Sequence, residues 1–190
     1  MGNASRVEPD DCILVDSDDT LRQKLQKVGW LNFIRKFHGY NLEVAKQFAA
    51  TFDGKKAVVG NLELQVTKQS IAEATGLMDE GEEWFKAGQF DKKTCPWNLF
   101  FKPKTPQEFG KGLPVKTLRK KYLAPMFIIK QYISCEGRYS LVFAFHIRLL
   151  MVFEDKTFNL PYFLFRSLIK MSKAYQKRLD VSSLFHHGLI

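Results

Sequence analysis

Basic side chains supply the clearest chemistry in this sequence. Residues 102–130 contain eight lysines and arginines and a single acid, Glu108. Cationic groups neutralise phosphates and neighbouring aromatic rings stack on bases, so Trp97, Phe101 and Tyr122 are candidate stacking groups. The same charges also fit a solvated face that keeps a Phe-rich protein soluble, and both interpretations stand. The candidate nucleic-acid-binding residues in this segment are Lys102, Lys104, Lys111, Lys116, Arg119, Lys120 and Lys121.

A second basic set lies further along the chain. Arg166, Lys170, Lys173 and Lys177 recur at three- and four-residue spacing, which places them on one face of a helix. They are further candidates for phosphate contacts, with a solvated helix face as the alternative. The basic run 119–121 also matches part of a nuclear localisation signal, so we expect a nuclear or cytoplasmic protein.

Catalytic signatures are absent from the sequence. No glycine-rich phosphate loop, serine-nucleophile elbow or H-E-x-x-H zinc motif occurs. His146 lies in an apolar stretch, where we expect a core histidine, and His186–His187 lies among the last few residues. A two-metal nuclease site needs about three converging carboxylates, and nothing in the spacing of the acids supplies them. We therefore predict a protein that is not an enzyme, with no catalytic residue, no metal site and no cofactor.

Charge divides the chain into two halves. Residues 1–100 contain 13 Lys and Arg against 15 Asp and Glu, whereas residues 101–190 contain 16 against 5. This imbalance indicates either an anionic partner for the basic half or an acidic tail that offsets it. The anionic partners that fit are DNA, RNA and an acidic protein surface.

The apolar residues and the cysteines indicate an intracellular protein. Cys12, Cys95 and Cys135 are odd in number and far apart, which fits neither a disulfide framework nor a zinc site. The longest apolar run, 141–153, is too short to span a bilayer and contains charged Arg148. We expect this run to be a buried helix and expect no membrane partner.

Helical periodicity and capping residues define the first half. We expect order to begin near residue 18, after an acidic tail over 1–17. A helix is predicted over 16–37, with a cap at Asp18 or Asp19 and a break at Gly29, and another over 42–52. A hairpin with its turn at 60–61 is predicted next, followed by a helix over 68–75 between Thr67 and Gly76.

The second half reads as a loop followed by helices. Glycines, prolines and aromatic residues crowd 88–116, which we expect to be an ordered loop pinned by aromatic rings and to hold any internal boundary. Helices are predicted around 84–85 and over 115–123, 125–135, 139–154 and 160–178. Pro125 takes the first position of the helix over 125–135, and Asn159 caps the helix over 160–178. The predicted fold is a single, mainly α domain over 18–180 with one small β-hairpin (α+β), and a tail over 181–190.

The segment over 66–77 carries a family resemblance. It reads V-T-x-x-x-I-A-E-A-T-G-L, after a helix with Trp30 and an apolar helix that ends at Phe52, and before Gly81 and Trp84. This layout, over about residues 28–170, resembles plant transposon-associated domains and is similar, more loosely, to the plant mobile domain. The resemblance implies a helical, non-catalytic domain derived from a plant mobile element. It implies no functional residue, and the chain has no zinc knuckle, aspartic-protease D-[ST]-G or reverse-transcriptase Y-x-D-D motif.

Three functions follow from these observations. The first is a non-catalytic domain that binds nucleic acid or an acidic partner through its basic half. The second is a protein–protein interaction or self-assembly module, capsid-like in role, whose basic face is only solvating. The third is a nuclease or transposase remnant.

Overall fold

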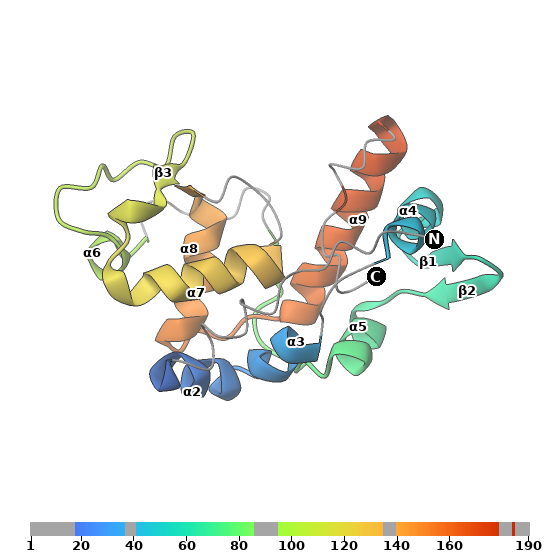
Figure 1. Ribbon diagram of the computed structural model, residues 1–190, viewed down its shortest axis with the longest axis horizontal. Helices are drawn as coiled ribbons and strands as arrows, with labels where there is room; N and C mark the ends of the chain where they lie inside the picture. Colours follow the sequence, from blue (N-terminus) through green and yellow to red (C-terminus); the bar gives the residue numbers. More distant parts are fainter. Residues whose placement is uncertain (1–17, 37–40, 86–94, 135–139, 179–183, 185–190) are drawn as a thin grey trace. The chain divides into compact units, whose positions relative to one another are not determined.

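The structure is a computed structural model that describes residues 18–36, 41–85, 95–134, 140–178 and 184 (Figure 1). The chain divides into two compact units, one formed by 1–83 with 158–190 and the other by 84–157. The predicted mainly α fold with a small hairpin is confirmed. The single domain over 18–180 stays a prediction. These predicted features lie outside the described residues: the tail over 1–17, the tail over 181–190 except Leu184, Cys12, Cys135 and His186–His187.

Two short helices open the first unit. α2 (Asp19–Lys27) is capped by Asp18, whose Oδ1 accepts a hydrogen bond from Leu21 N at 3.0 Å. Gly29 has a φ of +73°, a left-handed conformation that favours glycine, and it separates α2 from α3 (Trp30–Lys36). Four of the five apolar residues at helical spacing, Leu21, Leu25, Leu31 and Ile34, are buried, and the fifth, Val28, is half-buried.

The predicted hairpin follows the next helix. α4 (Leu42–Thr51) is capped by Asn41, whose side chain accepts hydrogen bonds from two backbone N–H groups of the first turn. β1 (Lys56–Val59) and β2 (Leu62–Gln65) pair antiparallel about a two-residue turn at 60–61. Figure 1 shows β1 between α4 and β2.

The helix after the hairpin is bounded as its sequence predicts. α5 (Lys68–Thr75) begins with a reciprocal cap, in which Ser70 N donates to Thr67 Oγ1 at 3.0 Å and Thr67 N donates to Ser70 Oγ at 2.9 Å. Gly76 ends the helix with a φ of +74°. The 66–77 segment is therefore a capped structural unit.

The longest helix among the described residues lies in the first unit. α9 (Leu160–Arg178) packs against α4 and α5. Its predicted cap, Asn159, accepts a hydrogen bond from the backbone of the first turn at 2.8 Å and donates to Asp79 Oδ1 at 2.6 Å. Near the other end, Gln176 Nε2 donates to the carbonyl of Phe52 at 3.0 Å, just beyond α4. Side-chain hydrogen bonds thus fix α9 at both ends.

The second unit combines short helical segments with a two-stranded ladder. β3 and β4 pair antiparallel, with Leu113 opposite Val142. The segments η2, η3 and η5 are 3₁₀ turns, and η4 is π-helical. Its described elements are α6 (Trp97–Phe100), β3 (Leu113–Pro114), η2 (Val115–Thr117), η3 (Lys120–Tyr122), α7 (Leu123–Ile128), η4 (Ile129–Ser134), β4 (Leu141–Val142), α8 (Ala144–Leu150) and η5 (Met151–Glu154). Its buried core includes Phe100, Leu118, Met126, Ile129, Ile133, Ile147 and Leu150.

Several predicted helices of the second unit are wrong in position. The helix expected at 125–135 begins at Leu123, so Pro125 is its third residue, which is tolerated because N–H groups of a first turn have no helical partner. Of the helix expected over 139–154, residues 141–142 form β4 instead, because they pair with β3 far away in sequence. The helix expected around Trp84 is absent; the indole is buried and the Arg148 guanidinium lies 5.1 Å from the centroid of its ring.

No helix in the described part of the chain is both long and apolar enough to cross a membrane. The apolar run over 141–153 forms β4, α8 and η5, and most of its side chains are buried.

Candidate nucleic-acid interface

The seven candidate basic residues between 102 and 121 lie on irregular backbone of the second unit. Lys102 and Lys104 follow α6, Lys111 precedes β3, and the other four lie in or beside η2 and η3. All seven side chains are exposed. We call these seven residues the basic segment.

Backbone pairing brings the two ends of the basic segment together. Phe101 and Leu118 form an antiparallel bridge, and Arg119 N donates to Phe100 O at 2.8 Å. Leu118 and Arg119 are extended, with ψ of 150° and 147°, and Leu118 is fully buried. The predicted helix over 115–123 is therefore wrong, because this long-range pairing holds the chain extended between two 3₁₀ turns.

Two of the basic side chains are anchored to the backbone across this pairing. Lys102 Nζ donates to Lys116 O at 2.7 Å, and Arg119 Nε donates to Phe101 O at 3.0 Å. Each bond uses one donor of a group that has several. The anchored cations keep further donors for a ligand, and their positions are fixed beforehand.

Aromatic rings lie beneath the basic segment. The Trp97 ring centroid is 4.8 Å from that of Phe109 and 5.2 Å from that of Phe101, and Phe100 lies 4.7 Å from Tyr122. Phe101 is 2% exposed and Tyr122 1%, whereas Trp97 is half-buried. Anchoring by aromatic rings is confirmed for the described part of the 88–116 loop, 95–116. The expected stacking role is wrong for Phe101 and Tyr122, because both rings fill the core.

The charge of the basic segment is little neutralised. Lys121 Nζ lies 3.2 Å from Glu154 Oε1, and hydrogen bonding to Tyr122, ahead of that to Glu154, raises the pKa of Lys121. Within the described residues, Lys102 forms no ion pair. Four further lysines of the segment have no side-chain partner among these residues: Lys104, Lys111, Lys116 and Lys120. The segment therefore presents a largely uncompensated positive surface.

The second basic set lies on α9, in the first unit. Arg166, Lys170, Lys173 and Lys177 are exposed, and the predicted placement on one helix face is confirmed. Arg166 Nη1 donates to the hydroxyl of Tyr162 at 3.0 Å. The two basic sets thus belong to different compact units.

One basic residue of the 102–130 stretch does not belong to the surface. Lys130 lies in η4, is 4% exposed, and its Nζ donates a hydrogen bond to Leu141 O of β4. Burial lowers the pKa of Lys130 to about 8. Its position inside the apolar sequence MFIIKQYI was the available signal of burial. Lys130 connects η4 to β4 and offers no charge to a ligand.

The buried histidine is part of the core, as its sequence context predicts. His146 is fully buried; its Nδ1 accepts a hydrogen bond from Phe143 N at 3.1 Å, and its Nε2 lies 3.4 Å from Ser134 Oγ. Because Nδ1 accepts, the neutral ring carries its proton on Nε2 and donates it to the serine. His146 therefore cannot take the proton of Ser134, and the pair is not a nucleophile with its base.

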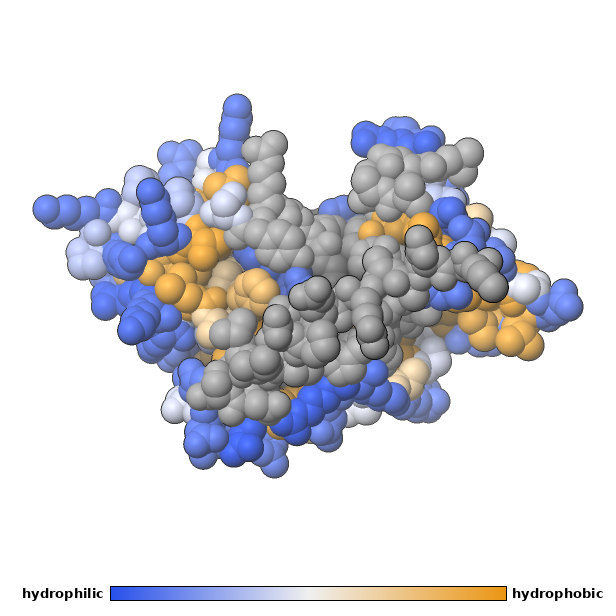
Figure 2. Space-filling model, viewed as in Figure 1, coloured by the Kyte–Doolittle hydropathy of each residue, from blue (hydrophilic) through white to orange (hydrophobic). Residues whose placement is uncertain are grey.

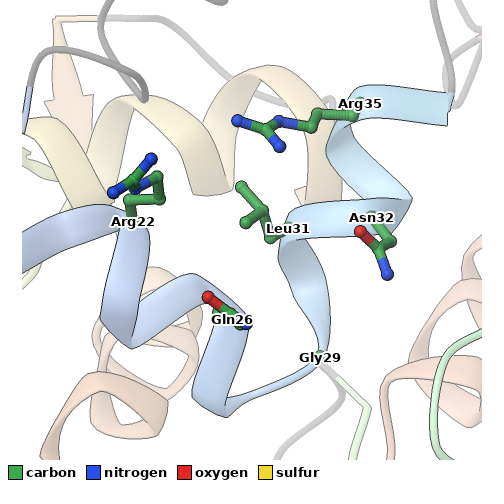
Figure 3. Close-up of a pocket in the computed structure, with 6 residues that line it drawn as sticks. All are labelled: Arg22, Gln26, Gly29, Leu31, Asn32 and Arg35. Atoms are coloured by element: carbon green, nitrogen blue, oxygen red, sulfur yellow. The ribbon is translucent and has the colours of Figure 1, made fainter. Parts of the chain in front are cut away.

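A polar hollow lies between α2 and α3 (Figure 3). It has a volume of about 370 Å³ and is lined by Arg22, Gln26, Gly29, Leu31, Asn32 and Arg35. Arg22 also forms an ion pair with Asp19 at 3.0 Å. No sequence pattern indicates this hollow, because it depends on how α2 and α3 lie against each other. Its lining contains hydrogen-bond donors and amide groups, which can bind a polar ligand.

Metal and thiol chemistry find no support in the described residues. Among them, no group of three or more His, Cys, Asp or Glu side chains is placed to hold a metal ion. Cys95 is buried, and burial raises the pKa of its thiol to about 11, which leaves it protonated and unreactive near neutral pH.

Comparison with protein-family models, curated proteins and solved structures finds no significant match to this chain. The resemblance to plant transposon-associated domains stays a prediction that rests on the residues of 28–170.

Proposed function

We propose that this protein is a non-catalytic domain that binds the phosphate backbone of a nucleic acid through the basic segment. The observation that carries the proposal is the set of exposed lysines without an ion pair in the described structure, Lys104, Lys111, Lys116 and Lys120, beside the anchored Lys102 and Arg119. Phosphate contacts of this kind release counterions, so the binding is strong at low salt and weak at high salt.

The buried aromatic rings favour recognition of phosphates over bases. Single-strand binding uses exposed rings on which bases stack. Phe101 and Tyr122 are unavailable for this, and Trp97 is half-buried against Phe109. We therefore expect duplexes to bind at least as well as single strands of equal charge, with little dependence on base sequence.

Two triple variants with the same loss of charge test the location. One replaces Lys104, Lys116 and Lys120 by glutamine; the matched control makes the same replacement at Lys170, Lys173 and Lys177. Binding of a labelled duplex is followed by fluorescence anisotropy between about 50 and 200 mM salt. We expect the first triple to lower the slope of log K against log salt by up to about 2.7 and to weaken binding clearly more than the control does.

Two results would refute the proposal. One is no measurable binding at the lowest salt. The other is an equal loss of affinity in both triple variants, which would make net charge and not the basic segment responsible. Polyglutamate that competes as well as a duplex of equal charge would favour an acidic protein partner instead.

The remaining predicted functions have separate support and separate tests. The exposed hairpin favours the self-assembly alternative, and it is independent of the basic segment. The nuclease or transposase remnant requires metal-dependent cleavage of plasmid DNA that is lost when single carboxylates are replaced. We also propose, on the resemblance over about residues 28–170 alone, that the domain derives from a plant mobile element.

A further inference from the structure

The β1–β2 hairpin has two edges, and α4 covers one of them. Thr51 Oγ1 accepts a hydrogen bond from Val58 N at 2.9 Å and lies 2.9 Å from Val58 O. Gln47 Oε1 accepts from Gly60 N at 2.8 Å. Side chains of α4 thus satisfy the outward backbone groups of Val58, and Asp53, just beyond α4, satisfies those of Lys56. Native proteins protect exposed strand edges in this way.

The edge formed by β2 is open. Val59 and Leu62 flank the two-residue turn and exchange backbone bonds, so the next pair, Val58 with Glu63, points its N–H and C=O groups away from the hairpin. The same alternation turns the backbone of Gln65 outward. No hydrogen bond joins the outward backbone groups of Glu63 or Gln65 to another residue that the structure describes.

Apolar side chains accompany this open edge. All four residues of β2 are exposed, with Leu62 at 67% and Leu64 at 40%. Both lie on the hairpin face that also carries Ala57 and Val59. Figure 2 shows hydrophobic surface where Figure 1 places the hairpin. An open edge with exposed leucines is the arrangement that β-strand addition uses.

The strand is complementary to a second copy of itself. Within β2, only Glu63 and Gln65 point their backbone groups outward. In an antiparallel pair of β2 strands, each of these residues must therefore lie opposite the other one, or opposite the same residue, of the second copy. A two-fold axis at Glu63 would oppose two carboxylates, which is unfavourable. An axis at Leu64 instead places Glu63 opposite Gln65 of the second copy, twice, and brings the two Leu64 side chains together.

We propose that two copies of this chain associate through their β2 strands, antiparallel, about a two-fold axis at Leu64. The pairing forms four backbone hydrogen bonds, two from each Glu63–Gln65 pair, and joins the leucine faces of the two hairpins. Because the strand has four residues, the contact is small, and we expect a weak dimer with a Kd in the range of about 10 to 500 µM. The proposed dimer depends on the hairpin alone and not on binding to nucleic acid.

Proline at position 63 isolates the intermolecular bonds. The Glu63 N–H takes no part in the hairpin, so Glu63→Pro removes a donor of the proposed interface without removing a β1–β2 bond. Glu63→Thr is the matched control: it removes the carboxylate and its ion pair with Lys56 but keeps the N–H. Leu64→Lys opposes two charges at the axis and serves as a second variant if the proline variant does not fold by circular dichroism.

Sedimentation of the nucleic-acid-free protein at about 0.5 M salt measures the association, because bridging through the basic segment is suppressed there. We expect a concentration-dependent dimer for wild type and Glu63→Thr, and at least a tenfold weaker dimer for Glu63→Pro and Leu64→Lys. A wild-type monomer at the highest concentration, or a dimer that persists in both interface variants, would overturn the proposal.

Cysteine cross-linking tests the register. Residues opposite each other in a non-hydrogen-bonded antiparallel pair have Cα atoms about 4.5 Å apart, within reach of a disulfide. Leu64→Cys should therefore form a disulfide-linked dimer under mild oxidation, whereas Leu62→Cys, with Val66 of the second copy opposite it, should not. Wild type under the same oxidation corrects for its own cysteines. Equal cross-linking of both variants would exclude the axis at Leu64.

Discussion

Burial of Lys130 makes the stability of this protein depend on pH in a particular direction. The folded-state pKa of about 8 lies below the ordinary value of 10.5, because burial disfavours the ammonium. The unfolded chain therefore binds this proton more tightly than the folded chain. Below pH 8 the buried ammonium lowers the free energy of unfolding by its full amount. The free energy of unfolding then rises with pH through the interval between the two pKa values.

The size of the effect follows from the shift in pKa. The pKa of Lys130 differs by about 2.5 between the folded and unfolded states. This difference lowers the free energy of unfolding by about 3 kcal/mol at pH 7 and by about 1 kcal/mol near pH 9.5. Lys130→Met keeps the apolar stem but loses the bond to Leu141 O, which costs about 1 kcal/mol. We expect the variant to be about 2 kcal/mol more stable than wild type at pH 7 and about equal to it near pH 9.5.

Urea unfolding at both pH values, followed by tryptophan fluorescence and by circular dichroism, measures this difference. Comparing the variant with wild type at each pH cancels other groups that titrate, including Cys95, whose raised pKa acts in the opposite direction above pH 9. Lys120→Met is the control, because this lysine is exposed in the same unit. This variant measures the effect of replacing a lysine by methionine without burial.

A difference between Lys130→Met and wild type that does not change with pH would refute the reasoning. It would mean that the Lys130 ammonium is as well solvated in the folded protein as in the unfolded chain. A variant that is less stable than wild type by the same amount at both pH values would show that only the hydrogen bond to Leu141 matters.

Three further predictions concern the first unit. Gly81→Ala should destabilise the protein by more than about 2 kcal/mol in urea unfolding, because φ is +92° and a Cβ would lie 2.9 Å from the backbone of Phe158. The control is Gly76→Ala, whose Cβ meets nothing within 4 Å. A loss of stability no larger than that of the control would contradict the prediction. Asn159→Ala should lower the free energy of unfolding by about 1 to 2 kcal/mol, since it removes the cap of α9. Any loss of helix content measured by circular dichroism should be no larger than the share of α9. The amide of Asn159, and then Lys68, hold the pKa of Asp79 below its usual value, so this carboxylate stabilises the fold above its unfolded pKa and the stabilisation is lost as pH falls through that range. The melting temperature of wild type should thus fall more steeply below about pH 4 than that of Asp79→Asn, and parallel curves would exclude the contribution.

Local structure in this protein could be predicted from its sequence where the determinants are local. The caps Asp18 and Thr67 and the break at Gly29 each act within one turn, and the structure confirms them. The candidate basic residues were identified in the same way, since an exposed lysine is the ordinary case. The hairpin followed from its turn residues and flanking apolar runs.

Long-range contacts decided the features that the sequence did not predict. Leu118 is extended because it pairs with Phe101, and Val142 forms a strand because it pairs with Leu113. The position of Lys130 likewise depends on β4, whose Leu141 carbonyl accepts a hydrogen bond from Nζ. None of these contacts leaves a periodic pattern in the sequence near the residue concerned.

Propensity, capping and charge are properties of neighbouring residues, so the helices of the first unit, their caps and the cationic half of the chain could be predicted from the sequence. Which aromatic rings are buried and which strand edge is open depend on the tertiary structure. Packing of Phe101 and Tyr122 into the core makes both rings unavailable for stacking on bases, and α4 covers one edge of the hairpin while β2 stays open. Burial depends on residues far away in sequence, and burial determines which groups of this protein are available to a partner.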